Sequence, residues 1–120
     1  MLLVDDDAGA RRSIQLLLRA KGFDVRAYAT GSALLADPSS GQARCFVTDY
    51  YMDDLDGIEL LSRLRGMGWN GPAVLITADP SPDLHEHARA RGFAAVVEKP
   101  FRDGLLVGTV TRLATEQPAA

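Results

Sequence analysis

The chain alternates short apolar runs with longer segments of helical period, and this alternation limits the folds open to it. The sequence predicts strands at residues 2–4, 24–28, 45–47, 73–76 and 94–97. It predicts helices at residues 8–21, 31–36, 56–66, 82–91 and 102–114. Strands separated by helices cannot be joined as hairpins, so they run parallel, with right-handed crossovers that place helices on both faces. We therefore predict the α/β class, with a doubly wound five-stranded parallel sheet.

Length and composition fit one globular domain. The chain has 120 residues, of which 47% are hydrophobic and 24% charged, so it can form one sizeable core. We expect a domain over residues 1–115 and a tail or linker over 116–120. The apolar runs are far shorter than the roughly 20 residues that cross a bilayer, and Asp5 interrupts any signal-like segment. We expect no membrane contact and a cytoplasmic location.

The net charge and a few individual residues argue against several other functions. A formal net charge of -3 disfavours direct nucleic acid contact by this domain, because phosphate binding usually needs a basic excess. The one cysteine, Cys45, cannot form an internal disulfide and is expected in the core. His85 and His87 lie on a polar helix without a second ligand pair, so we expect surface positions. Trp69 is expected to serve as a packing anchor.

Polar residues follow four of the predicted strands, where a parallel sheet gathers its carboxyl ends at one edge. They are Asp5, Asp6, Asp7, Asp49, Thr77 and Lys99, with Ala78 directly after Thr77 and Pro100 directly after Lys99. Carboxylates packed this closely repel one another, so the cluster calls for a hard cation, and oxygen ligands favour Mg²⁺ or Mn²⁺. Asp7 is more simply explained as the cap of the first helix.

The chemistry of this edge suits a phosphoryl group. A divalent ion can bridge carboxylates to a phosphoryl oxygen, and Thr77 and Lys99 can satisfy the other oxygens. The chain has neither glycine-rich nucleotide motif, so a nucleotide is not the obvious ligand. A carboxylate can itself accept a phosphoryl group. Asp49, at the end of the predicted central strand, is the best-placed acceptor.

These residues, in this order and spacing, resemble the receiver domains of two-component response regulators. The resemblance covers essentially the whole chain. It rests on Val4-Asp5-Asp6-Asp7, Val47-Thr48-Asp49 with Met52 and Asp56-Gly57, Thr77-Ala78 and Lys99-Pro100-Phe101. It implies a flavodoxin-like strand order of 2-1-3-4-5.

The resemblance also implies a role for each site residue. Asp49 would be the phosphoacceptor, with Asp5, Asp6, Asp49 and the backbone carbonyl of Tyr51 holding Mg²⁺. Thr77 and Lys99 would take part in the transfer and, with Ala78 as the small residue that leaves access, bind the phosphoryl group. Pro100 would follow a cis peptide bond. Tyr51 and Asp79 would flank the pocket and set the rate of hydrolysis.

The implied function is phosphorylation-dependent signalling rather than enzymatic turnover. A histidine kinase or histidine phosphotransfer protein would phosphorylate Asp49, the domain would assist this transfer, and slow autodephosphorylation would reset it. The surface of helix 82–91, strand 94–97 and helix 102–114 would then switch and could form a homodimer. Glu98-Lys99-Pro100-Phe101 and the strand at 25–28 resemble regulators whose output is a helix-turn-helix DNA-binding domain.

Two positions depart from the family pattern. Asp53 stands where proline is usual, and the added carboxylate is expected to strengthen Mg²⁺ binding. Val96 stands where an aromatic switch residue is usual, so any relay from Thr77 must use backbone shifts. Leu84 is the only large apolar residue of helix 82–91, which predicts a weakly anchored helix that can move.

Two other functions remain as alternatives. A receiver-like module that is never phosphorylated and serves only protein contacts is disfavoured, because the five central site residues are all present. A Mg²⁺-dependent phosphatase with an aspartyl-phosphate intermediate would need a second acid two residues after Asp49, where Tyr51 stands, and a cap domain for which no chain is left.

Overall fold

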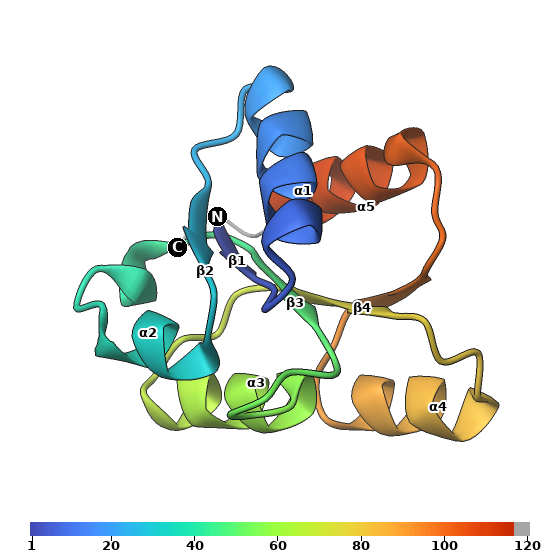
Figure 1. The fold of residues 1–120 in the computed structure, drawn as a ribbon. Coiled ribbons are helices and arrows are strands. Elements are labelled where there is room, and N and C mark those ends of the chain that lie inside the picture. Colours follow the sequence, from blue (N-terminus) through green and yellow to red (C-terminus); the bar gives the residue numbers. More distant parts are fainter. Residues whose placement is uncertain (117–120) are drawn as a thin grey trace.

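The computed structural model describes residues 1–116, which form five strands and five α-helices in alternation (Figure 1). The strands are β1 (Leu2–Val4), β2 (Arg26–Tyr28), β3 (Phe46–Asp49), β4 (Ala73–Thr77) and β5 (Ala95–Glu98). The helices are α1 (Ala8–Ala20), α2 (Gly31–Ala36), α3 (Gly57–Gly66), α4 (Pro82–Ala90) and α5 (Asp103–Glu116). No helix among these residues is both long enough and apolar enough to cross a membrane.

The strands form one parallel sheet in the order β2-β1-β3-β4-β5, which confirms the predicted topology. Helices α1 and α5 cover one face, and α2, α3 and α4 cover the other (Figure 1). Strand order reverses between β1 and β3, which pair directly. In such sheets this reversal opens a crevice at the carboxyl ends of the strands.

Short polar side chains start three of the helices. Asp7, Thr30 and Asp56 cap α1, α2 and α3 by accepting hydrogen bonds from backbone N–H groups three residues onward. Each such cap typically stabilises a helix by about 1 kcal/mol. Gly22 follows α1 at φ 93°, a conformation that favours glycine.

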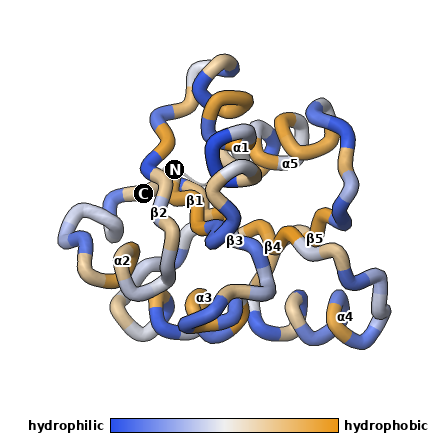
Figure 2. The backbone as a smooth tube through the Cα atoms, in the orientation of Figure 1, coloured by the Kyte–Doolittle hydropathy of each residue, from blue (hydrophilic) through white to orange (hydrophobic). Residues whose placement is uncertain are grey.

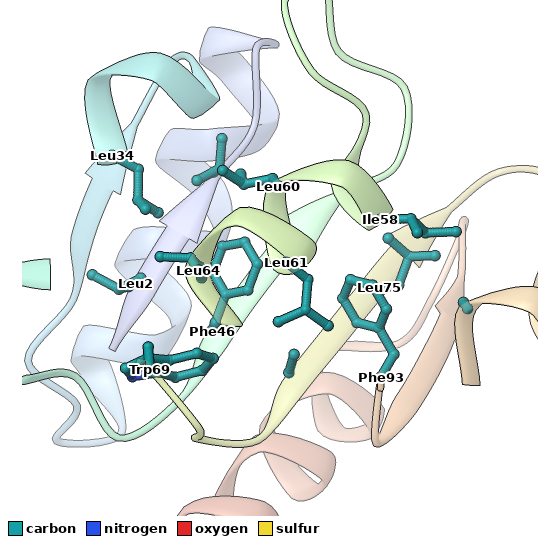
Figure 3. Close-up of a cluster of buried hydrophobic side chains, with 13 residues drawn as sticks. Leu2, Leu34, Phe46, Ile58, Leu60, Leu61, Leu64, Trp69, Leu75 and Phe93 are labelled. Carbon is teal, nitrogen blue, oxygen red and sulfur yellow. The ribbon is translucent and has the colours of Figure 1, made fainter. Parts of the chain in front are cut away.

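The sheet separates two apolar clusters. Figure 3 shows the larger one, in which Leu60, Leu61 and Leu64 of α3 lie over Phe46 and Leu75 of the sheet. The second lies beneath α1 and α5. In Figure 2 the hydrophobic colour runs along β4 and on to β5 at the edge of the sheet. Full burial of one such leucine or phenylalanine contributes about 1.5–3 kcal/mol to the stability of the fold. Packing on both faces of the central strands therefore stabilises the sheet beneath the site.

Helix α4 is the least anchored of the helices on its face. Only Ala88 of this helix is buried, and Leu84 is half-buried against the larger cluster. His85 is half-buried too, with Nε2 3.3 Å from Glu98 Oε1 of β5, so its predicted surface position is wrong. The helix turns this imidazole toward the sheet edge. His87 is exposed, as expected.

The structure corrects several predicted boundaries. A short 3-10 helix at Ser40–Gln42 lies between α2 and β3, where no helix was predicted. Strands β3, β4 and β5 continue one or two residues beyond their predicted ends, because hydrogen bonding to the neighbouring strands extends past the last apolar residue. Helix α5 includes Glu116, which we expected in the tail, and residues 117–120 lie outside the described residues.

Candidate functional site

Three carboxylates from two loops meet at the carboxyl edge of the sheet. Asp5 and Asp6 follow β1, and Asp49 is the last residue of β3. Because β1 and β3 are paired neighbours, one oxygen of each of the three carboxylates lies within 4.8 Å of the others. The structure therefore brings together the three acidic residues that the sequence placed at these strand ends.

Asp5 is the buried member of this group, with 1% of its surface exposed. Burial raises the pKa of its carboxyl, and the negative charges of Asp49 and Asp6 raise it further. The backbone N–H of Asp7 donates to Asp5 Oδ1 at 2.9 Å and opposes that shift, as does the Lys99 ammonium. A divalent cation would reduce the repulsion between this buried carboxylate and the two beside it, so the donor set fits Mg²⁺ or Mn²⁺.

Lys99 supplies the positive charge of the site. Its Nζ lies 3.2 Å from Asp49 Oδ2 and 3.9 Å from Asp5 Oδ2. The residue follows β5, its backbone N–H donates to Thr77 O at 2.8 Å, and the Lys99-Pro100 peptide bond is cis. One ammonium against three carboxylates leaves the site with a net negative charge, which favours a further cation.

The backbone around Asp49 is tightly fixed. Tyr50 N–H donates to Asp49 Oδ1 at 2.9 Å and also to Ile76 O at 2.9 Å. Gly57, at the start of α3, lies so close that an added Cβ would be 2.6 Å from the Asp49 carbonyl oxygen. The carboxylate therefore has one oxygen bound to the backbone and the other next to Lys99.

Thr77 is the last residue of β4 and is fully buried. Its Oγ1 accepts a hydrogen bond from the backbone N–H of Asp79 at 3.0 Å. Ala78, between them, is exposed and adds only a methyl group beside this edge of the sheet. This bond links the hydroxyl to the loop between β4 and α4 as an acceptor, so its O–H group can still donate to a ligand.

Two of the predicted modulators meet across the mouth of the site. Tyr51 has 61% of its surface exposed, and its hydroxyl donates to Asp79 Oδ2 at 3.3 Å. This bond joins the loop after β3 to the loop after β4. Asp53 is exposed and is not part of the group formed by the oxygens of Asp5, Asp6 and Asp49.

Sequence reasoning missed two residues that shape the site. Arg11 of α1 donates from Nη1 to the backbone oxygen of Asp5 at 2.9 Å. Asp54 binds the start of α2 from the middle of the loop after β3. Helical spacing could have placed Arg11 over the first loop, but no sequence signal connects Asp54 with α2.

A groove of about 600 Å³ lies beside Lys99, between α1 and the segment that follows β5. Apolar side chains line most of it, among them Ile14 and Leu17 of α1 and Phe101. Asp7, Lys99 and Asp103 supply its charged groups. A partner that reaches the acidic site from this side would meet an apolar surface first.

Proteins of known identity are similar in sequence to most of this chain. The chain is 30% identical over 118 residues to the transcriptional regulatory protein FixJ of Rhizobium meliloti, covering 98% of this chain and 58% of that protein. It is 31% identical over 107 residues to the C4-dicarboxylate transport transcriptional regulatory protein DctR of Rhodobacter capsulatus, covering 88% of this chain and 54% of that protein. The chain thus spans little more than half the length of these relatives.

Solved structures agree with the sequence comparison. The crystal structure of FixJ-N superposes with a TM-score of 0.87 at 30% identity, covering 99% of this chain and 95% of that one. A receiver domain of a Francisella response regulator gives a TM-score of 0.86 at 26% identity, covering 98% and 97%. The family model for the response regulator receiver domain matches residues 1–111, so the chain belongs to the family of response regulator receiver domains.

Proposed function

We propose that this receiver domain accepts a phosphoryl group on Asp49 from a phosphohistidine of a partner protein. The observation that carries the proposal is the setting of Asp49. Its Oδ2 lies 3.2 Å from the Lys99 ammonium, and its carboxylate belongs to the group formed with Asp5 and Asp6. An acceptor carboxylate with a cation at its side is suited to phosphoryl transfer.

The transfer is a displacement at phosphorus. The P–N bond to the donor imidazole breaks as a P–O bond to Asp49 forms, and the imidazole nitrogen keeps the electron pair of the broken bond. Asp5, Asp6, Asp49 and the Tyr51 backbone carbonyl would hold Mg²⁺, which neutralises charge on the phosphoryl oxygens. Lys99 stabilises the transferred oxygens by its positive charge. The Thr77 hydroxyl, which accepts from the Asp79 N–H and keeps its own proton for donation, donates to them, and Ala78 leaves them room.

The partner would be a histidine kinase or a histidine phosphotransfer protein. The apolar groove between α1 and Phe101 supports this proposal, because Lys99, which is ion-paired with Asp49, is one of its lining residues. A net charge of -3 gives this domain no general attraction to nucleic acid. Control of transcription would therefore require a separate effector domain, as the names of the relatives suggest.

The test is mass spectrometry of the protein after incubation with acetyl phosphate and Mg²⁺. We expect one added phosphoryl group of about 80 Da in the wild type and none in Asp49→Asn, since an amide oxygen is a poor nucleophile. Omission of Mg²⁺ should greatly slow the labelling. An unlabelled wild type would favour the pure contact module, label that persists in Asp49→Asn would place the acceptor elsewhere, and rapid turnover without label would favour the phosphatase.

The Tyr51–Asp79 bridge is proposed to slow hydrolysis of the acyl phosphate by limiting the access of water. Replacing Tyr51 with alanine should shorten the half-life of the phosphorylated form about fivefold, the rate equivalent of a hydrogen bond worth about 1 kcal/mol. Tyr51→Phe separates loss of the hydroxyl from loss of the ring. The decay of label after removal of the donor measures the effect, and an unchanged half-life in Tyr51→Ala would contradict the proposal.

Phosphorylation is proposed to shift α4 and β5. The support is the small buried surface of α4 and the hydrogen bond that ties Thr77 to the α4 loop at Asp79. Val96 is half-buried against the larger cluster and has no ring to exchange between positions, so the shift would move the backbone of β5. The α4-β5-α5 surface would then form a homodimer or bind an effector. Asp53 would add negative charge to the loop that carries Tyr51.

A further inference from the structure

The loop between β3 and α3 carries Tyr51, and its middle makes few hydrogen bonds to the rest of the described chain. Residues 50–56 contain no proline, so no ring fixes a backbone angle there. Hydrogen bonds at its two ends join Tyr50 to Ile76 and Gly57 to Tyr50. Between those ends, Asp54 makes most of the hydrogen bonds that the described chain provides to the loop.

Asp54 joins this loop to the start of α2, more than twenty residues earlier in the chain. Its Oδ2 accepts from Ser32 N at 2.9 Å and from Ser32 Oγ at 2.8 Å. Its Oδ1 accepts from Gly31 N at 3.3 Å and from Leu55 N at 2.8 Å. Both oxygens of one carboxylate thus connect the loop to α2.

Apolar packing supports the same contact. Gly31 is buried, and a Cβ added to it would lie 3.3 Å from Leu55 Cδ1. Leu55 itself is half-buried against the larger cluster. The loop and α2 therefore approach closely on the side of the sheet that α3 covers, where α2 and α3 lie next to each other (Figure 1).

The carboxylate is ionised at neutral pH. The backbone N–H of Ser32, followed by the Ser32 hydroxyl and the N–H groups of Leu55 and Gly31, lowers the pKa of Asp54 to about 2. The pKa of Asp54 is lower in the folded protein than in the unfolded chain. The contact therefore stabilises the fold above about pH 4, and this stabilisation is lost as the pH falls toward 2. At neutral pH all four donors face a full negative charge.

We propose that Asp54 is a positioning residue for metal binding, which holds the β3–α3 loop against α2 so that the Tyr51 backbone carbonyl stays at the acidic site. This inference rests on the proposed function. Asp54 lies three residues after Tyr51 in the same loop, so a displacement of the loop at Asp54 would be transmitted to Tyr51. Residues that orient a metal ligand typically change affinity about 10- to 100-fold when removed.

The test compares Mg²⁺ affinity, by isothermal titration calorimetry, among wild type, Asp54→Ala, Asp54→Asn and Thr30→Ala. The Thr30 hydroxyl accepts from Ala33 N at 3.0 Å, so Thr30→Ala removes the other side-chain cap of α2 and leaves the loop untouched. We expect the dissociation constant to rise about tenfold in Asp54→Ala. It should rise less in Asp54→Asn, which keeps one acceptor oxygen, and stay unchanged in Thr30→Ala.

Hydrogen exchange of residues 51–55 gives a second measurement, on folded protein without metal. Protection of these amides should fall in Asp54→Ala and not in Thr30→Ala. Equal Mg²⁺ affinity in wild type and Asp54→Ala, or an equal loss in Thr30→Ala, would overturn the inference and leave the proposed function intact. A wild type that neither binds Mg²⁺ nor becomes labelled on Asp49 would overturn the proposed function and this inference with it.

Discussion

Replacing Gly57 with alanine should destabilise the protein by about 3 kcal/mol and disturb Asp49, the proposed phosphoacceptor. The new Cβ would lie 2.6 Å from the Asp49 carbonyl oxygen, 2.8 Å from Leu75 Cδ1 and 3.0 Å from Thr48 Cγ2. One of these neighbours is backbone and the other two belong to fully buried side chains, so none can move aside cheaply. The start of α3 and the end of β3 would have to separate.

Urea unfolding of the purified variants measures this effect. The matched control is Gly66→Ala, at the other end of the same helix, where an added Cβ meets nothing within 4 Å. Alanine is the better helix former by up to about 1 kcal/mol, so Gly66→Ala should be neutral or stabilising. Phosphorylation should slow in Gly57→Ala and not in Gly66→Ala. Similar unfolding midpoints for the two variants would show that the close approach at Gly57 does not matter.

Replacing Asp5 with asparagine should have opposite effects on stability and function. In metal-free buffer at neutral pH, the free energy of unfolding should rise by on the order of 1 kcal/mol, because a buried carboxylate beside Asp49 and Asp6 is replaced by a neutral amide. The same change removes one of the carboxylates proposed to hold Mg²⁺. Mg²⁺-dependent phosphorylation of Asp49 should therefore fall by about 100-fold or more.

The pH dependence follows from the raised pKa of Asp5. The folded protein binds a proton on Asp5 more tightly than the unfolded chain does, so this group favours folding at low pH and loses that contribution as the pH rises through its folded pKa. The stability difference between wild type and Asp5→Asn should thus be smallest in acid and grow toward neutral pH.

Asp7→Asn is the control for this charge change. Asp7 is exposed, and asparagine caps a helix as well as aspartate does, so both stability and phosphorylation should stay within small changes of the wild type. Equal metal-free stability of wild type and Asp5→Asn would show that the cluster is not under electrostatic strain. Undiminished phosphorylation in Asp5→Asn would exclude Asp5 from the metal site.

Much of the fold could be predicted from the sequence because its signals are local. Helical spacing predicted a helix at residues 56–66, where α3 lies, and the short apolar runs predicted every strand. Caps such as Asp7 act within three residues of the backbone groups they satisfy. Strand boundaries were less accurate, because the hydrogen bonds that extend β4 to Thr77 come from β5.

The membership of the candidate site was also predictable, and for a reason of topology. Parallel strands place their carboxyl ends at one edge, so Asp5, Asp49 and Lys99 had to come close whatever the details of packing. No such rule predicts which other side chains contact one another. His85 was expected on the surface, but the rotation of α4 brings it to Glu98, and rotation depends on how α4 packs on the sheet.

The sequence by itself therefore determined the order of strands and helices and which residues share the carboxyl edge, because both follow from short-range periodicity and from the direction of parallel strands. Only the tertiary structure decided the contact of Asp54 with α2, the close approach of Gly57 to Asp49 and the bridge from Tyr51 to Asp79. Each of these contacts either joins segments far apart in the chain or depends on the distance between two backbone segments to within a few tenths of an ångström. Such distances are set by the packing of the whole core, which local sequence patterns do not encode.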